Sequence, residues 1–203
     1  MRVVIDGNIG SGKTHLIKLL KSKFSMIRVI EENVDEWEPY LKCFYENMKE
    51  NSLLFQMKVL EHHLKIGKET ENDKLCIIER SPLSCINVFG NDLKNEGFLK
   101  ELDISLMQSY SDNFGWIPDV IIYLQADADI SFERCKKRNR SGEESIAKQY
   151  LENINHLYND LYTGSNFDKT KVFIVNANND ADSVLNDTCE IITKNVLSKI
   201  ENS

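Results

Sequence analysis

Short apolar runs alternate along this chain with segments whose apolar residues recur at helical spacing. The runs are rich in β-branched residues and almost continuously apolar, which is typical of parallel strands buried on both faces. Between the runs, apolar residues at positions i, i+3 and i+4 indicate amphipathic helices. The strands predicted in this way are 2–6, 27–31, 74–79, 119–125 and 171–177, and the predicted helices are 16–24, 53–65, 154–162 and 181–200.

Strands that alternate with helices predict an α/β fold. We expect a five-stranded parallel sheet with helices on both sides, which gives three layers. Because the sequence contains no internal repeat, low-complexity tract or linker, residues 1–203 are expected to form a single domain. The three prolines, at positions 39, 82 and 118, are expected in loops.

Composition narrows the possible partners and the compartment. The formal net charge of −7 makes the chain a poor electrostatic match for a nucleic-acid backbone, so we expect no nucleic-acid partner. The five cysteines contain no C-x-x-C pair, which indicates a reducing compartment rather than a disulfide framework. No apolar run approaches the roughly 20 residues that a membrane span needs, and a strand pattern starts almost at the N-terminus. We therefore expect no membrane segment, no targeting peptide and a cytoplasmic location.

A glycine-rich segment joins the first predicted strand to the first predicted helix. It reads G-N-I-G-S-G-K-T and matches the phosphate-loop pattern G-x-x-x-x-G-K-[ST]. Glycines let backbone N–H groups converge on phosphates, and the N-terminus of the following helix adds partial positive charge. Lys13 is expected to reach the β and γ phosphates, and the Thr14 hydroxyl to bind Mg²⁺. The predicted nucleotide-binding residues are Gly7, Asn8, Ile9, Gly10, Ser11, Gly12, Lys13 and Thr14.

Three classes of protein use such a loop. A GTPase switch needs an N-K-x-D base reader, which the sequence lacks, and the D-x-x-G match at 112–115 has no apolar strand before it. We interpret that match as a loop. A motor ATPase needs an apolar run ending in a catalytic acid, for which 76–79 would serve, but the chain is too short for large partner-binding insertions. The third class is a small-molecule kinase, which requires an acceptor site and a mobile basic lid.

The segment 132–145 is the densest basic cluster in the chain and a candidate for that lid. Arg134 and Arg138 are four residues apart, so they share a face wherever the segment is helical. Arginines there would stabilise the negative charge that phosphoryl transfer concentrates on the moving group. We interpret residues 134–146, approximately, as an arginine-rich lid.

The second predicted strand ends in two carboxylates, Glu31 and Glu32. A carboxylate at the carboxyl end of a parallel strand beside a phosphate loop points into the ligand crevice. There it would take a proton from an attacking hydroxyl, as a general base does. Spacing alone does not choose between the two residues.

The predicted helix 53–65 offers a wall for a flat ligand. Apolar side chains and one amide share a face of this helix, a common composition for a heterocycle pocket. Glutamine carries a donor and an acceptor side by side and can pair with a base edge. The residues on this face are Gln56, Val59, Leu60 and His63.

Together these segments resemble the deoxyribonucleoside kinase family, which includes thymidine, deoxycytidine and deoxyguanosine kinases on a thymidylate-kinase-like phosphate-loop fold. Five motifs occur in the family's order and at similar spacing, over most of the chain. They are G-N-I-G-S-G-K-T (7–14), E-N-V-D-E-W (32–37), F-Q (55–56), E-R-S-P-L-S (79–84) and R-N-R-S-G-E-E-S (138–145).

The resemblance implies transfer of the ATP γ-phosphate to the 5′-hydroxyl of a deoxyribonucleoside in nucleotide salvage, with Mg²⁺ and in a homodimer. It favours Glu32 over Glu31 as the base for that hydroxyl. Arg80 would hold the hydroxyl and the incoming phosphate, and Glu79 would lie near Mg²⁺. Arg138 and Arg140 would clamp the phosphates from the lid. Lys13 of the loop and Arg134 of the basic cluster, predicted above from the residues themselves, complete the expected phosphate contacts.

The same resemblance implies the residues that hold the nucleoside. Trp37 and Phe55 would pack around the base, and Gln56 would read its edge. Tyr45 would bind the deoxyribose 3′-hydroxyl together with Glu144. One extra glycine, Gly142, separates the lid arginines from the acids and leaves Glu143 as an alternative to Glu144.

Two positions bear on which base is accepted. Family members that favour purines or cytosine carry an arginine one turn beyond the base-wall valine, here Val59, and an aspartate just after the E-R-S segment. This chain has His63 and Cys85 at those places. It is therefore more similar to the thymidine-accepting branch, and we expect a pyrimidine, thymidine and/or deoxycytidine. A hydrogen bond from His63 leaves broader specificity open. The rival predictions are a nucleoside monophosphate kinase and a nucleotide-binding module without turnover.

Overall fold

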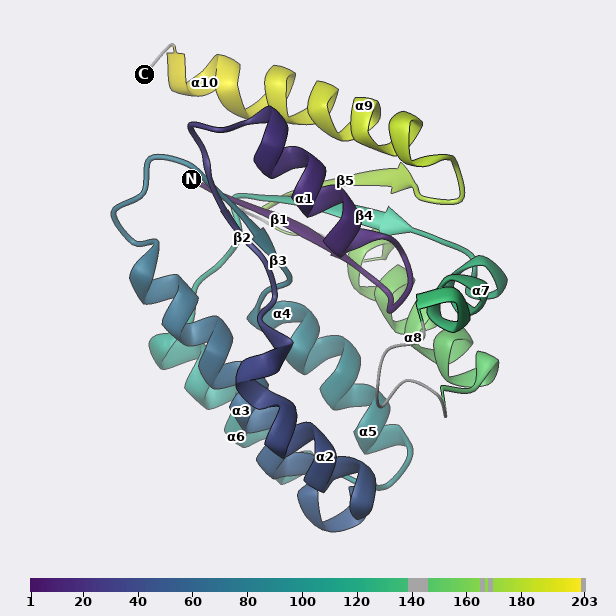
Figure 1. Ribbon diagram of the computed structural model, residues 1–203. Coiled ribbons are helices and arrows are strands. Elements are labelled where there is room, and N and C mark those ends of the chain that lie inside the picture. The colour runs from purple at the N-terminus through teal and green to yellow at the C-terminus, as the bar shows by residue number, and fades with distance from the viewer. Residues whose placement is uncertain (139–145, 165–166, 168–169, 202–203) are drawn as a thin grey trace.

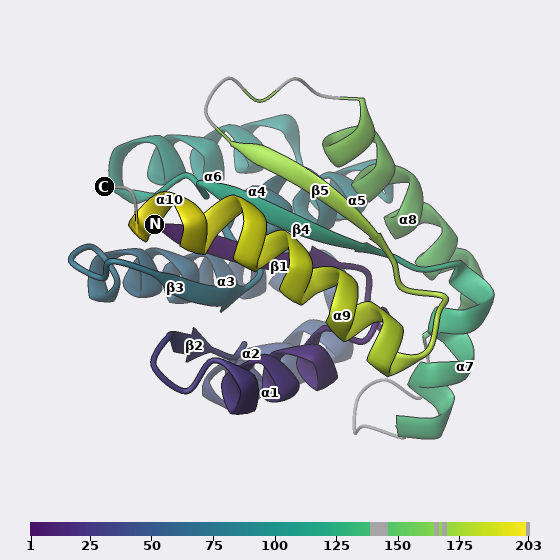
Figure 2. The same cartoon turned by 90° about the horizontal axis from the view of Figure 1, so that it is seen from above.

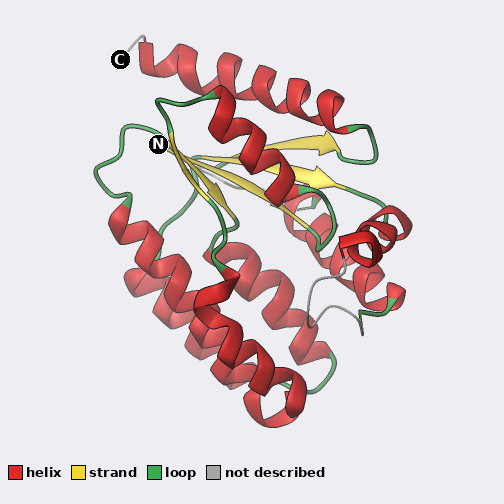
Figure 3. Cartoon of the chain, viewed as in Figure 1, coloured by secondary structure: helices red, strands yellow, loops and turns green. Residues whose placement is uncertain are grey.

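The computed structural model describes residues 1–138, 146–164, 167 and 170–201. Its centre is a five-stranded sheet in the order β2-β3-β1-β4-β5, and all four neighbouring pairs are parallel. This confirms the predicted α/β fold with a parallel sheet between helical layers (Figure 3). The strands are β1 Arg2–Gly7, β2 Arg28–Ile30, β3 Cys76–Glu79, β4 Val120–Gln125 and β5 Lys171–Asn176.

The sheet is buried on both faces because alternate residues of each strand point into different helical layers. Val3 and Ile5 pack with α1 (Lys13–Lys23) and α9 (Ala181–Ile192) on one face. Val4, between them, packs on the other face, where α8 (Lys148–Thr163) contributes. Figures 1 and 2 show α1 and α9 on one side of the sheet and α8 on the opposite side.

A third apolar cluster lies beyond the sheet, among helices at the lower end of Figure 1. The 22-residue helix α3 (Met48–Glu69) runs through it and packs against α2 (Glu38–Glu46) and α6 (Glu101–Phe114). Leu60 and Met107 are fully buried there. Phe44, Cys85 and Leu93 of this cluster line a pocket that Ile9 of the phosphate loop also lines.

Several helices were not predicted from apolar spacing. They are α2, α6, α7 (Ala128–Arg138), the 3₁₀ turn Val34–Trp37, and the run α4 Pro82–Ser84, π-helical η2 Cys85–Gly90 and α5 Asn91–Asn95. The predicted helix 181–200 consists of α9, the π-helical turn Thr193–Leu197 and α10 Ser198–Glu201.

Two loop predictions were wrong. Residues 112–114 form the last turn of α6, and only Gly115 of the D-x-x-G match lies outside it. Pro39 and Pro82 lie in the first turns of helices rather than in loops. Proline is tolerated there because the first helical N–H groups have no partner within the helix. None of the described helices combines the length and apolar character that crossing a bilayer requires.

Candidate active site

The phosphate loop connects β1 to α1, as its spacing predicts. Gly10 has φ 78°, and a Cβ there would lie 2.3 Å from the Ser131 carbonyl oxygen of α7, so both the backbone angle and the space require glycine. Gly12, at φ 99°, precedes the first residue of α1. The loop is therefore pressed against α7, with the N-terminus of α1 at its end.

Lys13 lies at the bottom of this loop and is only 5% exposed. Its Nζ donates to the Asn8 carbonyl oxygen at 2.8 Å, inside the loop. Burial, followed by the charge of Arg80, lowers the pKa of Lys13 to about 8. A phosphate anion beside Nζ would favour the charged form, so the loop is suited to an anionic ligand.

A donor pocket opens beside the loop and encloses about 880 Å³ of space, part of it open to solvent. It is lined by the loop from Gly10 to Thr14, by Arg134 and Arg138, and by the segment after β5 that contains Asn179. Arg134 donates to the Ala177 carbonyl oxygen at 2.9 Å, which joins α7 to that segment. Gly7, Asn8 and Ile9 do not line this pocket among the described residues; Ile9 lines the acceptor pocket instead.

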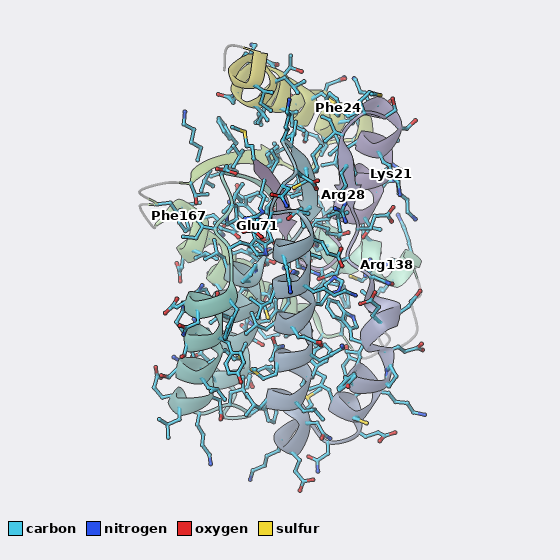
Figure 4. The ribbon with its side chains drawn as sticks, turned by 90° about the vertical axis from the view of Figure 1, so that its left-hand side faces the viewer. Lys21, Phe24, Arg28, Glu71, Arg138 and Phe167 are labelled. Carbon is cyan, nitrogen blue, oxygen red and sulfur yellow. The ribbon has the colours of Figure 1, made fainter. Side chains whose placement is uncertain are left out.

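The acceptor pocket lies on the other side of the loop and encloses about 990 Å³. Arg138, at the end of α7 in Figure 4, lines both pockets. Arg140 and Glu144, with most of the predicted lid, lie outside the described residues. The structure brings together in this pocket the predicted residues Glu32, Trp37, Tyr45, Phe55, Gln56, Val59, His63, Arg80 and Cys85.

Glu32 and Arg80, which both line the acceptor pocket, form an ion pair. Their side chains are 8% and 12% exposed, so little water competes with the pair. Glu31, the alternative at the same strand end, instead pairs with Lys21 of α1, 3.6 Å away. The structure therefore separates the two carboxylates, and Glu32 is the one in the pocket.

Glu79 connects the donor and acceptor sides. Its Oε1 accepts from the Thr14 hydroxyl at 3.1 Å, and its Oε2 accepts from the Glu32 backbone N–H at 3.3 Å. Burial, followed by the negative charge of Glu32, raises the pKa of Glu79. Neutralising that repulsion with a cation would stabilise both carboxylates, as a metal ion does.

Arg80 has a constrained backbone. Its φ of 61° lies in the left-handed region, which costs a non-glycine residue roughly 1–2 kcal/mol. The Arg80 N–H donates to the Ile5 carbonyl oxygen of β1 at 3.1 Å, and the guanidinium lies 5.0 Å from the ring centroid of Phe89. These contacts hold the strained residue and position the guanidinium in the acceptor pocket.

The base wall comes from α3 and the helices packed on it. Phe55 stacks on Phe44 with ring centroids 5.1 Å apart, and Trp37 is 3% exposed. The Cys85 thiol donates to Gln56 Oε1 at 3.6 Å, and burial raises the pKa of that thiol, so it stays protonated. Leu60, which we predicted on the same face, is buried in the third apolar cluster instead.

His63 is fully buried behind this wall. Neither ring nitrogen has a hydrogen-bond partner among the described residues. Burial lowers the pKa of His63 to about 3, so the ring is neutral and carries one donor and one acceptor. No cation therefore faces the base from this position.

A group of residues that we did not predict supports the loop from beneath. The Asp6 carboxylate is fully buried at the end of β1. It accepts from the Gly7 N–H at 2.8 Å, the Tyr158 hydroxyl at 2.8 Å and the Tyr162 hydroxyl at 2.7 Å. The sequence offered two signals for this group: an aspartate in an apolar strand, and two tyrosines one turn apart on a predicted helix.

The Tyr158 hydroxyl also lies beside Arg80. Burial and the charge of Asp6 raise the pKa of Tyr158, and the Arg80 guanidinium opposes that rise. A second contact of α8 reaches the loop at Asn8, whose Nδ2 donates to Asn155 Oδ1 at 2.7 Å and to the Leu151 carbonyl oxygen at 2.8 Å. One face of α8 thus supports both the phosphate loop and Arg80.

The fold and the paired pockets define a phosphate-loop enzyme that moves a phosphoryl group between two ligands. The family model of the deoxynucleoside kinases matches residues 3–200, so the chain belongs to the deoxynucleoside kinase family. It is therefore an ATP-dependent phosphotransferase that acts on small-molecule deoxynucleosides.

The chain is also similar to individual proteins. The chain is 30% identical over 193 residues to protein 029R of Invertebrate iridescent virus 3, covering 95% of this chain and 96% of that one. It is 29% identical over 175 residues to mitochondrial thymidine kinase 2 of Homo sapiens, covering 81% of this chain and 66% of that one. The structure of deoxyadenosine kinase from M. mycoides shares the fold, with a TM-score of 0.84 at 24% identity, over 95% of this chain and 99% of that chain.

We expect Tyr158→Phe to lower kcat by about tenfold, because the missing hydroxyl leaves Arg80 less well positioned. It also removes one donor from a buried carboxylate, which costs roughly 1–3 kcal/mol of stability. Steady-state kinetics and the Tm measure the two effects.

Tyr162→Phe is the matched control, because it removes a donor from the same carboxylate, while the Arg80 charge acts on Tyr158 and not on Tyr162 among the described residues. It should lower the Tm to a similar extent and change kcat much less. Equal losses of kcat in the two variants would mean that Tyr158 only solvates Asp6.

Proposed function

We propose that this enzyme transfers the γ-phosphate of ATP to the 5′-hydroxyl of a pyrimidine deoxyribonucleoside, with thymidine or deoxycytidine as the preferred acceptor. The observation that carries the proposal is the buried Glu32–Arg80 pair in the acceptor pocket, which Glu79 connects to Thr14 of the donor pocket. A carboxylate there lies at the carboxyl end of a parallel strand, where an acceptor hydroxyl would meet the phosphate.

In this mechanism Glu32 accepts the proton of the 5′-hydroxyl as the 5′-oxygen bonds to the γ-phosphorus. The bond from the γ-phosphorus to the bridging oxygen breaks, and ADP leaves. Arg80 pairs with Glu32 and faces the charge that builds on the transferred group. Lys13 and Arg138 supply further positive charge from the loop and the end of α7.

Mg²⁺ fits the donor set at the end of the loop. The Thr14 hydroxyl and the Glu79 carboxylate provide adjacent oxygens, the ligand type that Mg²⁺ prefers. When bound, the ion would neutralise phosphate charge. Thr14 and Glu79 would hold it, and the raised pKa of Glu79 is consistent with a carboxylate that gains from a nearby cation.

The preference for a pyrimidine rests on the chemistry of the base wall. Charged side chains among the described lining residues are Glu32, Arg80 and Arg138, and these lie toward the phosphates. The base end offers the Gln56 amide, the Cys85 thiol and the neutral His63 ring. An amide beside apolar walls suits a donor and an acceptor on adjacent atoms of a pyrimidine edge.

The substrate panel is the direct test. We expect kcat/KM to be highest for thymidine or deoxycytidine and roughly tenfold lower for the purine deoxyribonucleosides, because a good polar pairing is worth about 1–3 kcal/mol. Thymidine monophosphate, included in the same panel, should not be phosphorylated. Faster turnover of a purine would contradict the base preference, and turnover of the monophosphate would indicate a nucleotide kinase.

We expect Glu32→Gln to lower kcat by about 10²–10⁴-fold, because the base is lost while the shape of the pocket is kept. Nucleoside binding, measured by calorimetry, should remain. Glu31→Gln is the control, since Glu31 pairs with Lys21 outside the pocket, and its kcat should match wild type. Near-wild-type turnover by Glu32→Gln would remove Glu32 from this role.

We also propose that two copies associate through α6. Leu102, Leu106, Tyr110 and Phe114 recur every fourth residue on this helix and are 78%, 44%, 43% and 68% exposed. Contiguous exposed apolar patches are uncommon on monomeric proteins and mark interaction surfaces, so we expect another protein surface to cover this stripe. A second copy presents an identical stripe, which makes the interface self-complementary.

Light scattering should therefore give about twice the 23.5 kDa chain mass at micromolar concentration. Leu106→Asp should give the mass of one chain, because a charge in the apolar stripe opposes association. Met26→Asp is the control, since Met26 is 96% exposed and lies outside α6. A monomeric wild type would rule out this interface.

A further inference from the structure

A second cavity, of about 920 Å³, adjoins the acceptor pocket. Five residues line both cavities: Phe44, Tyr45, Leu93, Ile146 and Tyr150. The acceptor pocket and the second cavity are therefore adjacent, and we call them the first and second compartments. The base wall and the phosphate end both belong to the first compartment. The second compartment is lined neither by Gln56 and His63 of the base wall nor by Arg80 of the phosphate end.

An unusual carboxylate lies in the second cavity. Asp92 of α5 lines it, is only 4% exposed, and forms no hydrogen bond or ion pair with any described side chain. Buried carboxylates are normally paired or hydrogen-bonded, as Asp6 is by three donors. Among the described side chains, Asp92 thus has no donor of the kind that compensates the burial of Asp6.

The surroundings of Asp92 are acidic and aromatic. Burial, followed by the charge of Glu96 four residues later, raises the pKa of Asp92 to about 6, so it is largely ionised at neutral pH. The described residues that line this cavity include no lysine or arginine. The nearest lysine in sequence, Lys94, pairs with Glu101 at 3.2 Å.

Tyr45 and Tyr150 form the boundary between the compartments. The Tyr150 hydroxyl lies within the electrostatic influence of both Asp92 and Arg80, one from each compartment. Burial, followed by the Asp92 charge, raises the pKa of Tyr150. A ligand group that passes this boundary would therefore leave the reaction centre and meet Asp92.

We propose that Asp92, with Glu96 beside it, forms a subsite for a positively charged substituent on the sugar of the acceptor nucleoside, such as a 3′-ammonium group. This inference rests on the proposed function and on the expected contact between Tyr45, which lines both compartments, and the deoxyribose 3′-position. A substituent directed from that position away from the base enters the second cavity. There an ammonium group donates to Asp92 and supplies the missing partner.

The test compares two analogues of whichever natural deoxyribonucleoside binds best: the 3′-amino-2′,3′-dideoxynucleoside and the 2′,3′-dideoxynucleoside. Calorimetry at pH 7 gives a Kd for each, and their ratio isolates the contribution of the amino group. We expect wild type to bind the amino analogue about tenfold more tightly, as a charge-assisted hydrogen bond predicts. The ratio of kcat/KM values should shift in the same direction.

Asp92→Asn keeps the shape of the side chain and removes its charge, so the Kd ratio should fall to about one. Glu101→Gln is the control, because Glu101 is a nearby acid whose partner Lys94 lies outside the cavity lining. It should keep the wild-type ratio. Using a ratio within each variant removes any general effect of the substitution on nucleoside binding.

A wild-type ratio near one, with normal affinity for the natural nucleoside, would overturn the subsite and leave the proposed function intact. An unchanged ratio in Asp92→Asn would overturn it as well, because the amino group would then bind elsewhere. If none of the four natural deoxyribonucleosides bound, the proposed function would fail, and the subsite would fail with it.

Discussion

The buried positive charge of Arg80 is the constraint on which the active site depends. A guanidinium that is largely removed from water needs a negative charge beside it to offset the lost hydration. Removing one partner of a buried ion pair costs about 3–5 kcal/mol. Glu32 provides the direct counter-charge, while Asp6 and Glu79 add negative charge from the two neighbouring strand ends. The same guanidinium contributes to the lowered pKa of Lys13, so the acceptor and donor sides are already electrostatically linked before a ligand arrives.

How much of the fold the sequence predicts depends on how each segment is buried. All five strands were predicted because burial on both faces makes each an almost continuous apolar run. Helix α6 was missed because its stripe of Leu102, Leu106, Tyr110 and Phe114 faces outward, so its apolar positions do not form one inward face. The segment after Ser81 was missed for another reason: the π-helical turn Cys85–Gly90 breaks the helical period within a short stretch.

Active-site residues also differ in how well the sequence predicts them. Residues within contiguous motifs, such as Lys13, Glu32 and Arg80, were assigned from sequence. The structure places Lys13 in the donor pocket and the other two in the acceptor pocket. The support beneath the phosphate loop was not predictable, since Tyr158 contacts Asp6 across 152 positions and only tertiary packing brings them together. Asp92 is a related case. It is buried without a partner among the described side chains, and the pattern of residue types along the sequence does not predict this.

The support of the phosphate loop also explains where Arg138 lies. Helix α7 approaches the loop so closely that only glycine fits at position 10, and Arg134 donates to carbonyl oxygens on both sides of the donor pocket. Helix α8 holds the same loop through Asn8 and Asp6. Because α7 is packed against the loop, its last residue, Arg138, is fixed beside both pockets. A shift of α7 would therefore change the loop that binds the phosphates together with the arginine that faces them. Because of this close packing, the conformation of the phosphate loop and the position of Arg138 depend on each other.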